Sequence, residues 1–246
     1  MLAKLPFIHI APNPTEAAKL AAQLLAQELA KRSHARFAVA GGKSPETLYR
    51  ELARIPTVDW SKVEVFLGDE RFVPLQHPES NAGMLQRSLL AELPRAPRVH
   101  FPETDLPIDQ AAQAYAALLD EAPLDLVLLG MGDDGHLASL FPRGLGFAPG
   151  SPSYLPTLAP SGIQQRLSLS LDAINRASTV LLFVLGAKKA STLARLLGPA
   201  EGDQSADAFQ LPAALLAPSG ELHWVIDAAA AARLDLAVLA SGAPHV

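Results

Sequence analysis

The chain has 246 residues, of which 49% are hydrophobic and 18% charged, and its formal net charge is −5 at pH 7. This composition excludes a disordered chain, and the length allows a sizeable core in one large α/β domain or two small ones. The chain has no cysteine, which excludes disulfides, thiolate nucleophiles and zinc–thiolate sites. No basic stripe indicates a nucleic-acid partner, so an anionic ligand must be held by a few placed cations.

The beginning of the chain, MLAKLPFIHIAPNPTEAAKL, lacks the apolar core of a signal peptide. No apolar run reaches the roughly 18–20 residues that a membrane span needs. We therefore expect no membrane insertion and a cytoplasmic location by default.

Apolar residues at helical spacing alternate along the chain with short apolar runs. The helical spacing predicts helices over residues 15–32, after Ser44-Pro45, and over 81–93, 109–121 and 187–197. The apolar runs predict strands over residues 37–40, 63–67, 126–129, 179–185 and 222–226, and alternation of polar and apolar residues predicts a half-buried strand over 166–171. This order is typical of an open, mainly parallel twisted sheet with helices on both faces. No linker is long enough to split the chain, so residues 1–246 are expected to form a single domain.

Glycines follow four of the predicted strands, at Gly41-Gly42, Gly68, Gly130 and Gly186. In open parallel α/β sheets, ligands bind at the carboxyl ends of the strands. We therefore expect the four loops to share one edge of the sheet. Their polar residues are candidates for one site.

The segment LVLLGMGDDGHLASLFP, residues 126–142, contains the spacing G-x-G-x-x-G of dinucleotide-binding turns. Three features disfavour a nucleotide. Pro142 limits any following helix to about two turns. Residues 150–160 offer neither the acidic residue nor the strand that the fingerprint requires. The two aspartates of the motif would face a pyrophosphate with like charge.

The same segment favours general-base chemistry. Asp134 and His136 flank Gly135 on a turn after a buried strand. A histidine beside an orienting carboxylate has the parts of a general base at neutral pH. The alternative, in which His136 merely caps a short following helix, stays open on this motif alone.

A candidate phosphate loop lies in AVAGGKSPETLYREL, residues 38–52. Gly41 and Gly42 let the backbone approach a ligand, and the next helix points its free amides at it. Ser44 adds a hydroxyl and Lys43 a charge. The pattern is not a Walker loop, and an ordinary tight turn with a helix cap remains the alternative.

Charged residues follow another predicted strand in VFLGDERFVP, residues 65–74. Asp69, Glu70 and Arg71 stand between apolar segments. Charges held in this way are more often paired or functional than those of a solvated loop.

Further cations follow the predicted strand over residues 179–185. Lys188 and Lys189 begin a predicted helix, where the macrodipole disfavours cations unless an anion is bound. Arg166 begins the strand RLSLSL and adds another cation.

Taken in order, GGKSP, GDERFVPLQHPESN, LVLLGMGDDGHLASLFP, RLSLSL and INRASTVLLFVLGAKKA resemble the 6-phosphogluconolactonases of the glucosamine-6-phosphate isomerase/6-phosphogluconolactonase family. The resemblance covers roughly residues 36–195. It implies a Rossmann-like fold of the glucosamine-6-phosphate deaminase and ribose-5-phosphate isomerase type. It also implies hydrolysis of 6-phospho-D-glucono-1,5-lactone in the oxidative pentose phosphate pathway, without a metal or organic cofactor.

The resemblance also implies roles for individual residues. His136 matches the histidine that activates the attacking water, and Asp134 is placed to orient it. The remaining matches are the phosphate loop Gly41, Gly42 and Ser44, the phosphate- or sugar-binding cations Arg71, Arg166 and Lys189, and the acidic site residue Asp69, whose role is not assigned. The expected partner is a small phosphosugar lactone, with no nucleic acid or membrane, and the chain is expected to be a monomer or homodimer.

The chain departs from the family pattern at Lys43, Ala40 and Leu137, none of which is assigned to the chemistry. A deaminase is the nearest alternative function. It is disfavoured because residues 137–142 carry no glutamate to assist ring opening, and because Arg71 stands where deaminases favour tyrosine.

A non-catalytic regulator that binds sugar phosphates is a further alternative. Such a protein could lose Asp134 or His136, and this chain keeps both. The missing basic patch disfavours a DNA-binding regulator.

Residues 142–165 form a long segment rich in proline and glycine, directly after the candidate site. Loops of this length are usually functional or disordered. We expect this segment to close over the lactone, so that its truncation raises KM without unfolding the protein.

Overall fold

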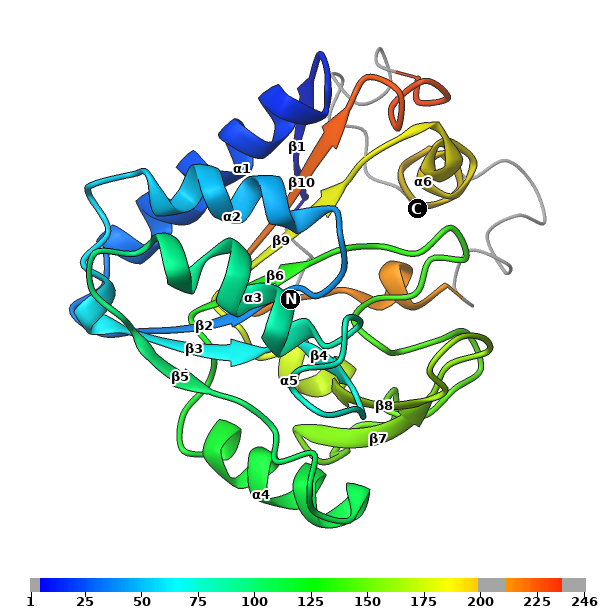
Figure 1. Cartoon of the computed structure of the whole chain (residues 1–246). Helices are drawn as coiled ribbons and strands as arrows, with labels where there is room; N and C mark the ends of the chain where they lie inside the picture. Colours follow the sequence, from blue (N-terminus) through cyan, green and yellow to red (C-terminus); the bar gives the residue numbers. More distant parts are fainter. Residues whose placement is uncertain (1–4, 199–210, 236–246) are drawn as a thin grey trace.

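Seven parallel strands form the central sheet of the structure, a computed structural model that describes residues 5–198 and 211–235 (Figure 1). Their order is β1-β10-β9-β6-β2-β3-β5, and every neighbouring pair is parallel. The strands are β1 (Phe7–Ala11), β2 (Ala35–Val39), β3 (Val63–Leu67), β5 (Arg98–His100), β6 (Leu126–Leu129), β9 (Thr179–Val184) and β10 (Glu221–Asp227). The predicted open parallel sheet is confirmed.

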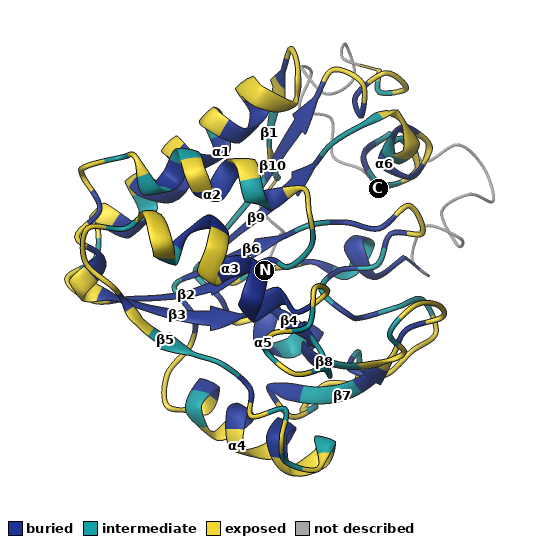
Figure 2. Ribbon diagram, in the orientation of Figure 1, coloured by how far each residue is buried: buried dark blue, intermediate teal, exposed yellow. Residues whose placement is uncertain are grey.

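Helices cover both faces of this sheet. One layer holds α1 (Pro14–Ala30), α2 (Pro45–Ala53) and α3 (Asn81–Ser88). The other holds α4 (Ile108–Asp120), α5 (Leu171–Asn175) and α6 (Ala190–Leu197). Along β6, Leu126 and Leu128 pack into the first layer while Val127 and Leu129 pack into the second. Burial on both faces explains why the strands are continuous apolar runs (Figure 2).

Three helices begin at side chains that cap their free amides. Asn13 Oδ1 accepts from the Glu16 amide at 3.0 Å before α1. Ser80 Oγ accepts from the Gly83 amide before α3, and Ser170 Oγ from the Ala173 amide before α5.

A second, three-stranded antiparallel sheet lies beside the first. It consists of β4 (Asp69–Arg71), β8 (Gln165–Leu169) and β7 (Tyr154–Leu158), in that order. The predicted strand over residues 166–171 is therefore present, but it is antiparallel. The expectation of no strand within residues 150–160 is wrong, because β7 lies there. Pro156 argues against a central strand, and β7 is indeed an edge strand, with α4 packed against it.

Some predicted helices differ from the structure in length. The helix predicted over residues 81–93 ends at Ser88, and a short 3₁₀ turn, Leu90–Glu92, follows. The helix predicted over 187–197 starts with a 3₁₀ turn, Ala187–Lys189, and continues as α6. Helix ends commonly tighten in this way.

The strand order sets the position of the site. From β2 the chain runs to β3 on one side, and from β6 it runs to β9 on the other. Such a switch point leaves a crevice at the carboxyl ends of the two neighbouring strands. This crevice lies between the loops that follow Val39 and Leu129.

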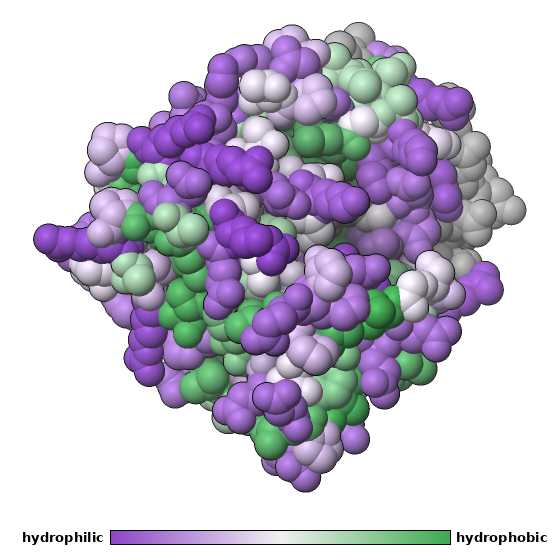
Figure 3. All heavy atoms as spheres, viewed as in Figure 1, coloured by the Kyte–Doolittle hydropathy of each residue, from purple (hydrophilic) through white to green (hydrophobic). Residues whose placement is uncertain are grey.

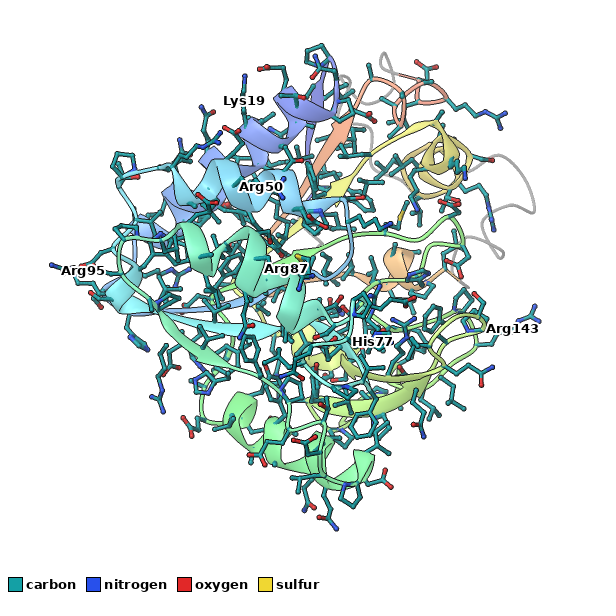
Figure 4. The ribbon with its side chains drawn as sticks, in the orientation of Figure 1. Lys19, Arg50, His77, Arg87, Arg95 and Arg143 are labelled. Atoms are coloured by element: carbon teal, nitrogen blue, oxygen red, sulfur yellow. The ribbon has the colours of Figure 1, made fainter. Side chains whose placement is uncertain are left out.

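The viewed surface is mostly hydrophilic, with smaller apolar areas between polar side chains (Figure 3). Figure 4 shows that the labelled cations come from separate elements, with Lys19 on α1, Arg50 on α2 and Arg87 on α3. Within residues 5–198 and 211–235, no helix combines the length and hydropathy that crossing a bilayer requires.

Candidate active site

A cavity of about 570 Å³ opens at the carboxyl ends of the central strands. The loops after β2, β3 and β6 and the end of β9 contribute to its walls, as the glycines at the strand ends predict. All the predicted site residues line it: Gly41, Gly42, Ser44, Asp69, Arg71, Asp134, His136, Arg166 and Lys189. The fold therefore brings together residues that lie up to 148 positions apart (189 − 41).

A tight turn after β6 carries the histidine. The Gly132 amide donates to the His136 carbonyl at 2.9 Å, and Gly135 has a φ of +77°. A bridge between Met131 and Leu137 closes the turn. No helix follows His136 before β7, so His136 caps none, and the helix that a dinucleotide site would need is also missing.

Asp134 holds the His136 ring. Nδ1 of His136 lies 2.7 Å from Oδ1 of Asp134, and the same oxygen accepts from the His136 amide at 3.2 Å. The Phe141 ring packs against the imidazole, with the ring centroids 4.6 Å apart. When Nδ1 donates to Asp134, Nε2 of the neutral ring is left as an acceptor that can take a proton from water.

The loop after β2 is shaped by a buried asparagine. A Cβ on Gly41 would lie 2.0 Å from Nδ2 of Asn81, so only glycine fits there. Gly42 has a φ of +88°, and its amide donates to Asn81 Oδ1 at 3.3 Å. Ser44 occupies the N-cap position of α2, but its hydroxyl makes no capping hydrogen bond, and it lines the cavity beside Lys43.

The two acidic residues of β4, Asp69 and Glu70, lie in different environments. Asp69 lines the cavity, while Glu70 is buried on the other side of the strand. Glu70 accepts from the backbone amides of Arg71, Asn81 and Ala82. Burial raises the pKa of Glu70, and these amides oppose the shift.

Two arginines face each other across the antiparallel sheet. Arg71 of β4 pairs directly with Arg166 of β8. Each guanidinium group donates one hydrogen bond to a backbone carbonyl. Arg71 Nη1 donates to Glu79 O at 2.5 Å, and Arg166 Nε donates to Ile163 O at 2.6 Å. Burial and the neighbouring charge of Arg71 lower the pKa of Arg166. Like charges in this position are costly, and a bound anion would relieve the cost.

The remaining predicted cation has a partner in the structure. Lys189 Nζ lies 2.5 Å from Oδ1 of Asp133 at the edge of the cavity. The Asp133 carbonyl in turn accepts from the hydroxyl of Thr192 on α6. Lys189 is thus held over the cavity by the turn that carries His136.

The sequence did not single out two residues that complete the site. Asn81 connects the glycine loop to β4, and Ser139 donates to Asp69 Oδ2 at 2.7 Å. Both residues lie in the sequence motifs that resemble the family, which could have indicated a role in the site. Their contact with Asp69 depends on the packing of α3 and the turn against β4, which a local pattern does not contain.

An open parallel sheet with a glycine-rich loop, facing arginines and a His–Asp pair in one crevice has the groups that an α/β protein acting on a small anionic ligand would need. Residues 13–224 match the family model described as glucosamine-6-phosphate isomerases/6-phosphogluconolactonase. The chain belongs to this family.

Relatives and solved structures agree with this assignment. The chain is 37% identical to a 6-phosphogluconolactonase of Synechocystis sp., over 85% of this chain and 89% of the relative. It is 37% identical to a human 6-phosphogluconolactonase, over 93% and 94% of the two chains. A crystal structure of a 6-phosphogluconolactonase from Thermotoga maritima is similar with a TM-score of 0.79 and 27% identity, over 91% of this chain and 100% of that one.

Proposed function

We propose that the chain hydrolyses 6-phospho-D-glucono-1,5-lactone to 6-phospho-D-gluconate, a step of the oxidative pentose phosphate pathway. The observation that carries the proposal is the shared cavity, in which the His136–Asp134 pair and the Arg71–Arg166 pair both lie. The first is suited to activate water and the second to hold a phosphate. The relatives named 6-phosphogluconolactonase support the choice of substrate.

In the proposed reaction, Nε2 of His136 takes a proton from a water molecule as the water oxygen attacks the C1 carbonyl carbon. The bond between C1 and the ring oxygen then breaks, and the ring oxygen receives a proton from His136. The product carries a carboxyl group at C1 and a hydroxyl at C5. General-base help of this kind is worth about 10²–10⁴-fold, which suits an ester that is already reactive.

The phosphate is the proposed anchor. The Gly41-Gly42 loop, the Ser44 hydroxyl and the facing arginines hold it, and Lys189 adds a charge. Because the phosphate does not react, the free energy of binding it is available to orient C1 toward the histidine.

A deaminase has less support from the same geometry. Among the described residues, Asp134 forms a hydrogen bond with the His136 ring and the Phe141 ring packs against it. Residues 137–142 supply no carboxylate that could serve ring opening beside the histidine.

The proposal is tested by hydrolysis of freshly generated 6-phosphogluconolactone, measured above its spontaneous rate, with the wild type and His136→Ala. The wild type is expected to be active and the variant to lose about 10²–10⁴-fold in kcat while its circular dichroism stays unchanged. An inactive wild type would contradict the lactonase, and ammonia release from glucosamine 6-phosphate would then be measured. The cytoplasmic location and the monomeric or dimeric state stay predictions.

A further inference from the structure

The neighbouring carboxylates of Asp69 and Glu70 on β4 accept different numbers of hydrogen bonds. An ionised carboxylate has about four acceptor positions. Glu70 accepts from three backbone amides and the Ser80 hydroxyl. Asp69 accepts, within the described residues, from the Asn81 side-chain amide at 3.1 Å and the Ser139 hydroxyl at 2.7 Å. Glu70 is thus saturated by the fold, whereas Asp69 keeps acceptor positions beside the cavity.

The donors to Asp69 are neutral and firmly placed. Asn81 is 1% exposed and Ser139 is 1% exposed. The Asn81 amide nitrogen also donates to the Asp69 carbonyl at 2.9 Å, and the Ser139 amide donates to Ser168 Oγ at 3.1 Å. One donor on each oxygen fixes the plane of the Asp69 carboxylate. A carboxylate that is 8% exposed and oriented in this way is preorganised for a donor from the cavity.

The same hydrogen bonds place Asp69 between the two ends of the proposed substrate. Asn81 joins it to the Gly42 amide of the phosphate loop. Ser139 joins it to the turn that carries His136, three residues earlier in the chain. A negative charge repels the phosphate, so the donors that suit Asp69 are hydroxyls between C1 and C6 of the sugar.

We propose that Asp69 accepts a hydrogen bond from one ring hydroxyl of the lactone and that Ser139 is the positioning residue that orients it for this contact. The inference rests on the proposed function and deepens it. Ser139 thereby determines specificity: it governs how strongly the enzyme prefers a fully hydroxylated sugar lactone over one that lacks the recognised hydroxyl.

The experiment compares kcat/KM for 6-phosphogluconolactone with kcat/KM for its 2-deoxy, 3-deoxy and 4-deoxy analogues. It uses the wild type, Ser139→Ala, Ser139→Thr and a control, Ser151→Ala. Ser151 also donates its hydroxyl to a carbonyl, that of Ala148, but it does not line the cavity. Thermal unfolding of each variant checks the fold.

The wild type is expected to disfavour one deoxy analogue by about ten- to hundredfold, the range for a hydrogen bond to a charged group. Ser139→Ala is expected to remove most of this preference for that analogue alone, and Ser139→Thr and Ser151→Ala to keep it. An equal loss on all four lactones in Ser139→Ala, or a wild type that hydrolyses all four equally, would overturn the inference and leave the lactonase standing. A wild type inactive on 6-phosphogluconolactone would overturn both.

Discussion

At the scale of single residues, Gly132 decides whether the histidine and its carboxylate can meet. A Cβ at this position would lie 2.1 Å from Nδ1 of His136 and 2.5 Å from Oδ1 of Asp134. We expect Gly132→Ala to displace the pair and to lower kcat by about hundredfold, the effect of misplacing a catalytic group by roughly 1 Å. Steady-state kinetics and a melting curve check this.

Gly130→Ala is the matched control for this change. A Cβ on Gly130 meets nothing within 4 Å, so the loss in kcat should be much smaller. Equal losses in the two variants would contradict the steric explanation. Gly132 therefore allows the His136 and Asp134 side chains to pack closely against the turn, and no pyrophosphate is needed to explain it.

At the scale of elements, Glu70 ties β4 to the beginning of α3. Its carboxylate accepts from the first amides of the helix, those of Asn81 and Ala82, at 2.7 and 2.8 Å. We expect Glu70→Ala to cost about 3 kcal/mol in the free energy of unfolding, because buried amides lose their acceptors. Urea denaturation measures the change.

Glu92→Ala, at an exposed position, is the control for Glu70→Ala and should stay within about 0.5 kcal/mol of the wild type. A Glu70→Ala variant as stable as this control would show that water replaces the lost acceptor. The acidic pair thus combines one structural carboxylate with one that faces the cavity.

The segment over residues 142–165 is not one lid, because β7 occupies part of it. Only the turn after β7 reaches the cavity, through Ala159, Pro160 and Ser161. Replacing residues 160–163 by two glycines should raise KM several-fold, since Arg166 loses the carbonyl of Ile163 that holds its Nε. The melting temperature should change little. Deleting Tyr154–Leu158 should instead prevent folding, because it removes buried Tyr154 and one of the two strands that pair with β8.

An unchanged KM in the shortened turn would show that this wall of the cavity does not help to bind substrate. The sequence predicts that the whole segment can be removed without unfolding, but because the segment contributes a paired strand, we expect its removal to unfold the protein.

At the scale of the whole molecule, two histidines make the stability depend on pH. Burial lowers the pKa of His9 and of His100 from the usual 6.5, and nearby His223 adds to the effect at His9. As the pH falls through 6.5, the unfolded chain binds protons before the native protein does. The free energy of unfolding is therefore expected to fall as the pH drops from 7 to 5.5.

Urea denaturation at several pH values measures this slope, and the variant His9→Asn/His100→Asn should flatten it. An equally steep slope in that variant would assign the pH dependence to other groups. Glu70, whose pKa is raised, acts in the opposite sense, because its protonation favours the native state as the pH falls.

Much of this architecture follows from local patterns in the sequence. Continuous apolar runs such as Leu126–Leu129 require burial on both faces, which predicts parallel strands between two layers of helices. The glycines and charges directly after these runs must lie at the carboxyl edge, so the cavity residues could be predicted before their contacts were known. The motifs from Gly41 to Lys189 also identified the family.

Tertiary structure alone decided which distant segments meet. The pairing of β1 with β10, and of β8 with β4 and β7, depends on packing between different segments of the chain. The periodicity of apolar residues within one segment does not predict such pairing. The charged triplet by itself did not distinguish Glu70 from Asp69, and only the resemblance to the family marked Asp69 as a site residue. The strand alternates its side chains between two sides, and only the packed fold shows which side faces α3 and which faces the cavity.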